Sequence, residues 1–153
     1  MNVSGQWIAL LFYKIGSLSF VLLGAGHLAT YFSAPETVER LNVIHAMQRF
    51  TINLAGTESN LFLFHEGFSL MMGILLIAYG LLNFDIIRKV PDIILSSAFL
   101  LRLNLVVSFV SLAISIHYFF LIPILFTAIS LICFLSVIGL TIKSARHHSS
   151  ENE

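Results

Sequence analysis

The sequence predicts an all-α, polytopic membrane protein: a four-helix transmembrane bundle with an amphipathic helix in its first outer loop. Composition is the first indication, because 58% of the 153 residues are hydrophobic and only 10% are charged, against about 25% charged residues in soluble domains. The mean hydropathy is +0.93. Four apolar runs are also long enough to cross a bilayer core, which takes roughly 20 helical residues. They cover about residues 7–32, 61–84, 93–116 and 118–142.

These spans form one predicted domain over residues 1–146. The runs show no period-two alternation, so transmembrane β-strands are disfavoured. The first run lacks a preceding basic region and is longer than a signal-peptide core, and we expect it to be retained as a span. The polar end, residues 147–153, is expected to be a disordered cytoplasmic tail.

Basic residues in the short loops set the expected orientation. Four of them flank span ends that should share one side of the membrane: Arg88, Lys89, Lys143 and Arg146. The longer first loop contains two, Arg40 and Arg49. This excess predicts that both termini are cytoplasmic. The formal net charge is zero, so the charge pattern does not indicate nucleic-acid binding.

The first outer loop, residues 33–60, is too long for a plain turn. Ser33 and Glu36 have the spacing of a capping box, and Pro35 suits the first position of a helix. Apolar residues then recur about once per turn, at Val38, Leu41, Ile44, Met47 and Phe50. This pattern predicts an amphipathic helix on the outer membrane surface or across the top of the bundle. The following turn is expected to place Thr57 or Ser59 as the cap of the second span.

Five polar residues inside the apolar runs are the candidate ligand-binding residues: His27, His65, Glu66, Arg102 and Asn104. Ionisable groups in a hydrocarbon core are costly and usually pair inside the bundle. His27 and Glu66 lie at similar depths below the outer surface, while Arg102 falls near the middle of the third predicted span. Because the arginine side chain is long enough to reach Glu66, we expect these three residues to cluster in the outer half of the bundle.

Small residues predict how the spans face one another, because they let transmembrane backbones approach closely. One stripe on the first span holds Gly16, Phe20, Gly24 and His27, and one on the second holds Glu66, Ser69, Gly73 and Gly80. We expect these two stripes to face each other. The third span has a stripe of Asn104, Ser108, Ser111 and Ser115, with Arg102 nearly opposite. Since both faces cannot serve one narrow core, one is expected to contact a second copy or a larger membrane complex.

Other interpretations of the polar residues stay open. A Glu66–Arg102 pair can simply lock two helices together. A haem site would depend on His27 and His65 at matched depth. A metal site would draw on His27, His65 and Glu66 with His45 or His117, but no HExxH-type spacing supports it. No metal is therefore predicted, and the cofactor is unknown.

Three short segments carry a resemblance to a known family: Gly24-Ala25-Gly26-His27-Leu28, Ala46-Met47 and Phe64-His65-Glu66-Gly67-Phe68-Ser69-Leu70. Their order resembles that of small, uncharacterised bacterial four-span inner-membrane proteins, broadly of the DoxX-like kind. The resemblance covers the first two spans and the loop between them. It implies a four-span architecture and a bacterial inner membrane, without an assigned activity.

These observations favour a non-enzymatic membrane protein that binds a small lipophilic or anionic ligand in the outer half of the bundle, or that acts as an accessory subunit. One alternative is a proton-coupled small exporter in which Glu66 exchanges a proton for a cationic substrate. Another is a lipid- or quinone-modifying membrane enzyme with His27 and Glu66 as an acid–base pair. The expected partners are the lipid bilayer and other copies or subunits.

Overall fold

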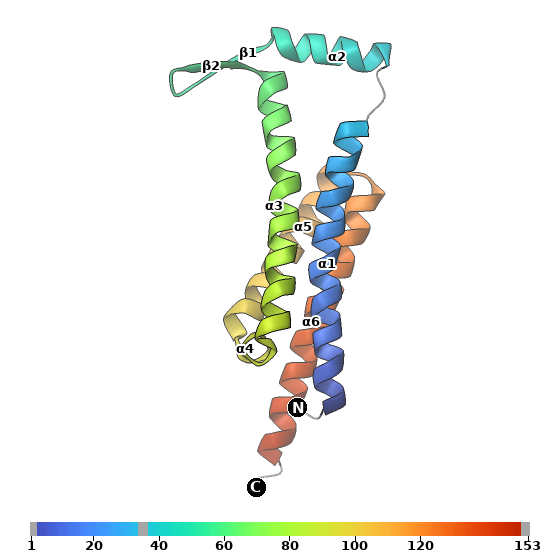
Figure 1. Ribbon diagram of the computed structural model, residues 1–153, viewed down its shortest axis with the longest axis vertical. Coiled ribbons are helices and arrows are strands. Elements are labelled where there is room, and N and C mark those ends of the chain that lie inside the picture. Colours follow the sequence, from blue (N-terminus) through green and yellow to red (C-terminus); the bar gives the residue numbers. More distant parts are fainter. Residues whose placement is uncertain (1–2, 34–36, 151–153) are drawn as a thin grey trace.

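Four long helices lie side by side in the computed structural model (Figure 1). They are α1 (Val3–Ser33), α3 (Leu61–Lys89), α5 (Ala98–Tyr118) and α6 (Leu121–Ser150). Each is long and apolar enough to cross a membrane. The structure describes residues 3–33 and 37–150. The predicted all-α, four-helix fold class is confirmed.

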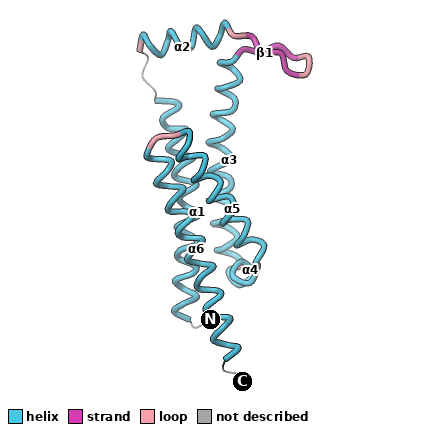
Figure 2. The backbone as a smooth tube through the Cα atoms, turned by 180° about the vertical axis from the view of Figure 1, so that it is seen from behind, coloured by secondary structure: helices cyan, strands magenta, loops and turns pink. Residues whose placement is uncertain are grey.

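The four helices are arranged in the spatial order α3, α1, α6, α5. Helix α1 packs against α3 on one side and against α6 on the other, and α6 also packs against α5. Over the described part of the chain, α3 and α5 make no comparable contact with each other. Helix α1 begins and helix α6 ends at the same end of the bundle, which we call the terminal end (Figures 1 and 2). Helix α2 and the strands lie at the opposite end, which we call the loop end. The bundle is therefore open between α3 and α5.

Glycines allow α1 and α3 to approach closely. A Cβ atom on Gly24 would lie 2.7 Å from the carbonyl oxygen of Gly73, and one on Gly80 would lie 2.6 Å from the carbonyl oxygen of Ser17. Such small residues let two helix backbones pack without intervening side chains. The predicted facing of the first two spans is confirmed at these positions, whereas Gly16 faces α6 instead.

The beginning of the first outer loop differs from its prediction. Helix α2 (Val38–Arg49) confirms the amphipathic helix, but its cap is Thr37, whose side chain accepts a hydrogen bond from the Arg40 N–H at 3.2 Å. Ser33 is the last residue of α1, and its hydroxyl donates to the carbonyl of Ala29. Glu36 lies outside the described residues. Ser33 is therefore not the cap, because the chain is still helical there.

A β-hairpin that the sequence analysis did not predict joins α2 to α3. Strands β1 (Thr51–Leu54) and β2 (Thr57–Asn60) pair antiparallel through the two residues Ala55 and Gly56. Both have positive φ, 52° and 82°, as a type I′ hairpin turn requires. Because β2 runs directly into α3, the cap of α3 is Asn60, which accepts from the Leu63 N–H at 2.9 Å. The expected cap at Thr57 or Ser59 is wrong.

The third predicted span is divided into two helices. Helix α4 (Pro91–Ser96) ends before Ser97, whose side chain caps α5 by accepting from the Leu100 N–H at 3.3 Å. The apolar helix that crosses the bundle therefore starts at Ala98 and not at residue 93.

The C-terminal segment also differs from its prediction. Helix α6 remains helical to Ser150, so much of the expected tail continues the helix, and residues 151–153 lie outside the described residues.

Candidate functional site

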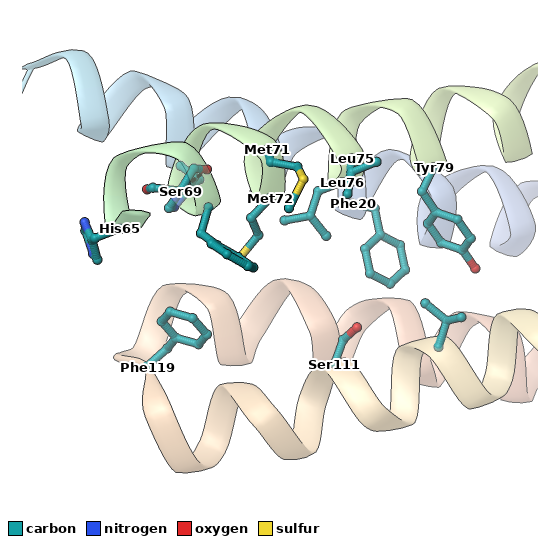
Figure 3. A pocket seen from close by; sticks show the side chains of 13 residues that line it. Phe20, His65, Ser69, Met71, Met72, Leu75, Leu76, Tyr79, Ser111 and Phe119 are labelled. Carbon is teal, nitrogen blue, oxygen red and sulfur yellow. Dashed lines mark hydrogen bonds between the residues drawn. The ribbon is translucent and has the colours of Figure 1, made fainter. Parts of the chain in front are cut away.

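A cavity of about 580 Å³ lies in the opening between α3 and α5, and we call it the lateral groove (Figure 3). Helix α1 contributes Phe20 and His27, α5 contributes Val107 and Ser111, and the α5–α6 connection contributes Phe119. The remaining lining residues all belong to α3: His65, Phe68, Ser69, Met71, Met72, Leu75, Leu76 and Tyr79. The groove is thus formed because α3 and α5 both pack mainly on other helices and little on each other.

The lining of the lateral groove is mostly apolar, and its polar side chains are concentrated at particular depths. His65 and Ser69 lie toward the loop end, whereas Ser111 and Tyr79 lie farther along the groove (Figure 3). The Tyr79 ring packs edge-on against Phe20, with ring centroids 5.0 Å apart and an interplanar angle of 90°. This aromatic pair limits the groove toward the terminal end.

His27 connects α1 to α3 at the loop end of the groove. Its Nε2 lies 3.0 Å from the Ser69 carbonyl oxygen and 2.9 Å from the Ser69 hydroxyl oxygen. A carbonyl oxygen only accepts, so the contact with the Ser69 carbonyl is a hydrogen bond when Nε2 is the donor. His27 and Ser69 are both half-buried. The predicted proximity of the first two spans at this depth is confirmed by these contacts.

Glu66 is half-buried near the loop end but makes its contacts with residues other than His27. The Tyr31 hydroxyl donates a hydrogen bond to Glu66 Oε2, and His65 Nδ1 lies 3.9 Å from Glu66 Oε1. Because the His65 side chain is 63% exposed, this last contact is weakly held. The carboxylate and the His27 imidazole therefore have separate partners, which does not favour them as an acid–base pair.

Arg102 does not join the predicted cluster. It is exposed, and it lies about one turn from the start of α5 near the terminal end, whereas Glu66 lies in the second turn of α3 at the loop end. Among the residues that the structure describes, no ion pair involves Arg102. The expected pairing of Glu66 with Arg102 is wrong. The break at Ser97 brings Arg102 close to a helix end, where its long side chain can extend to the membrane surface.

Asn104 instead belongs to a closed ring of hydrogen bonds that we call the Tyr–Asn ring. The Tyr79 hydroxyl donates to Asn104 Oδ1, and Asn104 Nδ2 donates to the Tyr13 hydroxyl at 2.8 Å. The Tyr13 hydroxyl donates to Asn83 Oδ1 at 2.6 Å. Asn83 Nδ2 then donates to the Tyr79 carbonyl at 3.0 Å. The ring joins α1, α3 and α5, and it fastens α3 to α5 at the end of the lateral groove that Tyr79 lines.

Three members of the Tyr–Asn ring were not among the residues predicted from the sequence: Tyr13, Tyr79 and Asn83. Tyr13 is fully buried and Asn83 is 7% exposed. Buried polar groups of this kind are retained only with partners, because an unpaired one is costly in an apolar interior. Tyr79 and Asn83 lie one helical turn apart within an apolar run, and this spacing of two polar residues is the sequence feature that could have indicated the ring.

Metal-ligand side chains are dispersed over the part of the chain that the structure describes. Within that part, no three His, Cys, Asp or Glu side chains gather closely enough to hold an ion. Cys133 is buried on α6 and unpaired, away from the lining of the groove.

Neither sequence nor structure comparison supplies a relative for this arrangement. No family model matches the chain, and no curated protein or solved structure matches it either. The lateral groove and the residues around it are therefore the basis on which a function is inferred.

Proposed function

We propose that this integral membrane protein binds a small lipophilic ligand in the lateral groove. The cavity of about 580 Å³ between α3 and α5 carries the proposal. Its size lies within the range of about 300–1,000 Å³ that is typical of small-molecule pockets. A helix pair that is held together at one end and separated along the rest of its length leaves space that a ligand or a lipid chain must fill.

The chemistry of the lining favours a lipophilic occupant. Methionine, leucine and phenylalanine side chains of α3 cover one wall, and methionine adapts to ligands of different shape because its side chain is unbranched and polarizable. Phe68, Met71 and Leu75 line the groove and are also exposed at the surface of the bundle. A ligand dissolved in the bilayer can therefore enter from the side.

An anionic ligand is less well supported than a lipophilic one. Arg102, the cation expected to attract it, is absent from the groove lining. At the loop end, the Glu66 carboxylate lies beside His65, which does line the groove. A negatively charged group placed there would be repelled.

Two neighbouring valines allow a matched test of the proposal. Val107 lines the groove, whereas Val106 points outward and is 57% exposed. In Val107→Trp the indole fills part of the cavity, while in Val106→Trp it enters the surrounding lipid. Each protein is reconstituted into nanodiscs with a diazirine-bearing palmitic acid, irradiated, and analysed by mass spectrometry of α3 peptides.

We expect saturable labelling of the Phe68–Leu76 region in the wild type and in Val106→Trp, and its loss in Val107→Trp. Excess unlabelled palmitic acid should compete for these sites and not for labelling of the outer surface. Labelling that resists competition in the wild type, or that is the same in both tryptophan variants, would contradict a binding site in the groove.

An accessory or oligomeric role is a second candidate, and exposed Arg102 is the observation in its favour. A charged side chain about one turn from the start of an otherwise apolar helix can be neutralised by a carboxylate of a second copy or of another subunit. Native mass spectrometry in mild detergent tests this role. Loss of the oligomer in Arg102→Leu would support it, and a monomer in the wild type would count against it.

We also propose a bacterial inner membrane with the terminal end in the cytoplasm. The basic residues Arg88 and Lys89 at the end of α3 and Lys143 near the end of α6 support this orientation, since cytoplasmic loops carry the excess of Lys and Arg. The resemblance of the first two spans to DoxX-like proteins supports the choice of membrane.

A further inference from the structure

Ser111 is the polar group of the lateral groove that is least explained by packing. It lies on α5, and its hydroxyl oxygen points toward α3 across the groove (Figure 3). Over the described residues, this hydroxyl has no hydrogen bond to any protein group. It is half-buried, on the stripe of α5 that also holds Asn104, Ser108 and Ser115.

Several other hydroxyl groups on the spans bond within their own helix. Ser17 donates to the Tyr13 carbonyl at 2.8 Å, Thr127 to the Pro123 carbonyl at 2.8 Å, and Ser136 to the Ile132 carbonyl at 2.8 Å. Each of these bonds returns to a backbone carbonyl four residues earlier, which satisfies the hydroxyl within its own helix. Ser108 and Ser111 both lack such a bond among the described residues. The Ser108 hydroxyl is buried and is not part of the groove lining, whereas the Ser111 hydroxyl is directed into the cavity.

We infer that the ligand of the lateral groove is a lipophile with a carbonyl oxygen that accepts a hydrogen bond from the Ser111 hydroxyl. This inference rests on the proposed function, because it specifies the chemistry of that same ligand. An unsatisfied hydroxyl in an apolar environment costs free energy, and a carbonyl on the ligand removes that cost. A pure hydrocarbon leaves the hydroxyl unpaired and is bound less tightly.

The surroundings of Ser111 define the kind of carbonyl compound. Phe20 and Leu76 line the same cavity, so the groups next to the carbonyl must be apolar. The groove continues from there toward the loop end over the methionines of α3 (Figure 3), which suits an alkyl or isoprenoid chain. Both a quinone and an acyl ester have this combination of one carbonyl region and one long chain.

The test compares ligands that differ in the carbonyl. Protein in dodecyl maltoside, a detergent without carbonyl groups, is titrated with decyl-benzoquinone, methyl dodecanoate or decylbenzene. Affinity is obtained from the concentration dependence of the unfolding temperature, because a ligand that binds only the folded state raises it. The first two compounds separate the quinone from the ester, and decylbenzene has the chain without an acceptor.

Ser111→Ala removes the donor with little risk to folding, because the side chain makes no protein hydrogen bond and alanine is a good helix former. We expect this variant to lose about three- to tenfold in affinity for the preferred carbonyl compound, with no change for decylbenzene. Ser136→Ala, in which the lost hydroxyl bonds only its own helix, should bind all three compounds as the wild type does.

The outcomes separate this inference from the proposed function. Saturable binding that is equal for decylbenzene and the carbonyl compounds, or that is unchanged in Ser111→Ala, would overturn the role of Ser111 and leave the groove as a binding site. If none of the three compounds binds in a way that Val107→Trp weakens, the proposed function itself is wrong. Stronger binding of the quinone or of the ester identifies the source of the carbonyl.

Discussion

Replacing Tyr13 by phenylalanine removes one oxygen atom from the centre of the Tyr–Asn ring. The Tyr13 hydroxyl donates to Asn83 Oδ1 and accepts from Asn104 Nδ2. Its loss leaves one acceptor and one N–H without partners at positions where Asn83 is 7% and Asn104 is 2% exposed. The aromatic ring remains, including its edge-on contact with Phe134 at 5.3 Å, so the packing changes little.

The expected cost follows from these two lost bonds. Interhelical hydrogen bonds in membrane proteins contribute about 0.6 kcal/mol on average and up to about 1.7 kcal/mol. Two such bonds predict a destabilisation of about 1–3 kcal/mol for Tyr13→Phe. Helicity followed by circular dichroism during titration of dodecyl maltoside micelles with dodecyl sulfate measures this difference.

Tyr118→Phe is the matched control. Tyr118 is 74% exposed at the end of α5, and removal of its hydroxyl should change stability by less than about 0.5 kcal/mol. Combining Tyr13→Phe with Asn83→Leu should cost less than the sum of the two single changes, because both remove the same bond. Equal stability of Tyr13→Phe and the wild type, or strict additivity in the double variant, would refute the ring as a stabilising unit.

Three further predictions concern packing, the hairpin and the orientation. Gly24→Ala should destabilise the bundle by about 1–3 kcal/mol, because the added Cβ would lie 2.7 Å from a backbone oxygen of α3. Gly26→Ala is the control and should be neutral in the same titration, because nothing lies within 4 Å of its added Cβ. Ala55→Asn should slow limited proteolysis of the hairpin, since asparagine tolerates the observed φ of 52° better than alanine does. A cysteine introduced at Glu58 should react with an impermeant maleimide in intact cells, and one introduced at Ser149 only after permeabilisation. The native Cys133 is buried and should give no background labelling.

Each of these three has a result that would contradict it. Similar losses of stability for both glycine variants would mean that the close approach of α1 and α3 is unimportant. Faster cleavage of Ala55→Asn would argue against the type I′ turn. The reverse labelling pattern would place the terminal end outside the cytoplasm.

The four spans were predictable from the sequence because membrane insertion depends on a property that composition records directly. A helix of roughly 20 apolar residues is required whatever its neighbours are, and each run shows it. The helix ends were less predictable, because α1 and α6 extend beyond the apolar runs. Continuation of a helix into polar sequence depends on local capping, which hydropathy does not report.

The candidate site was predicted only in part, because pairing depends on depth and rotation as well as on residue type. His27 and Ser69 face each other since the glycines around them bring α1 and α3 together, and that stripe was visible in the sequence. Arg102 was misplaced because Ser97, a residue without any strong helix-breaking property, ends α4 and starts α5. The lateral groove could not be predicted at all, since it arises because α3 and α5 meet only at the Tyr79–Asn104 hydrogen bond and stay apart along the groove.

The position of α1 between α3 and α6 has a consequence for how the protein is made. Contacts of α1 with α3 link neighbouring spans and can form as soon as the second span has been inserted. Contacts with α6 include the hydrogen bond from the Ser130 hydroxyl to the Gly16 carbonyl at 3.0 Å and the packing of Phe134 on Tyr13. These contacts connect the first span to be synthesised with the last, so one face of α1 stays uncovered in the membrane until synthesis is almost complete. During that interval the nascent chain is exposed to mispairing and to membrane quality-control proteases.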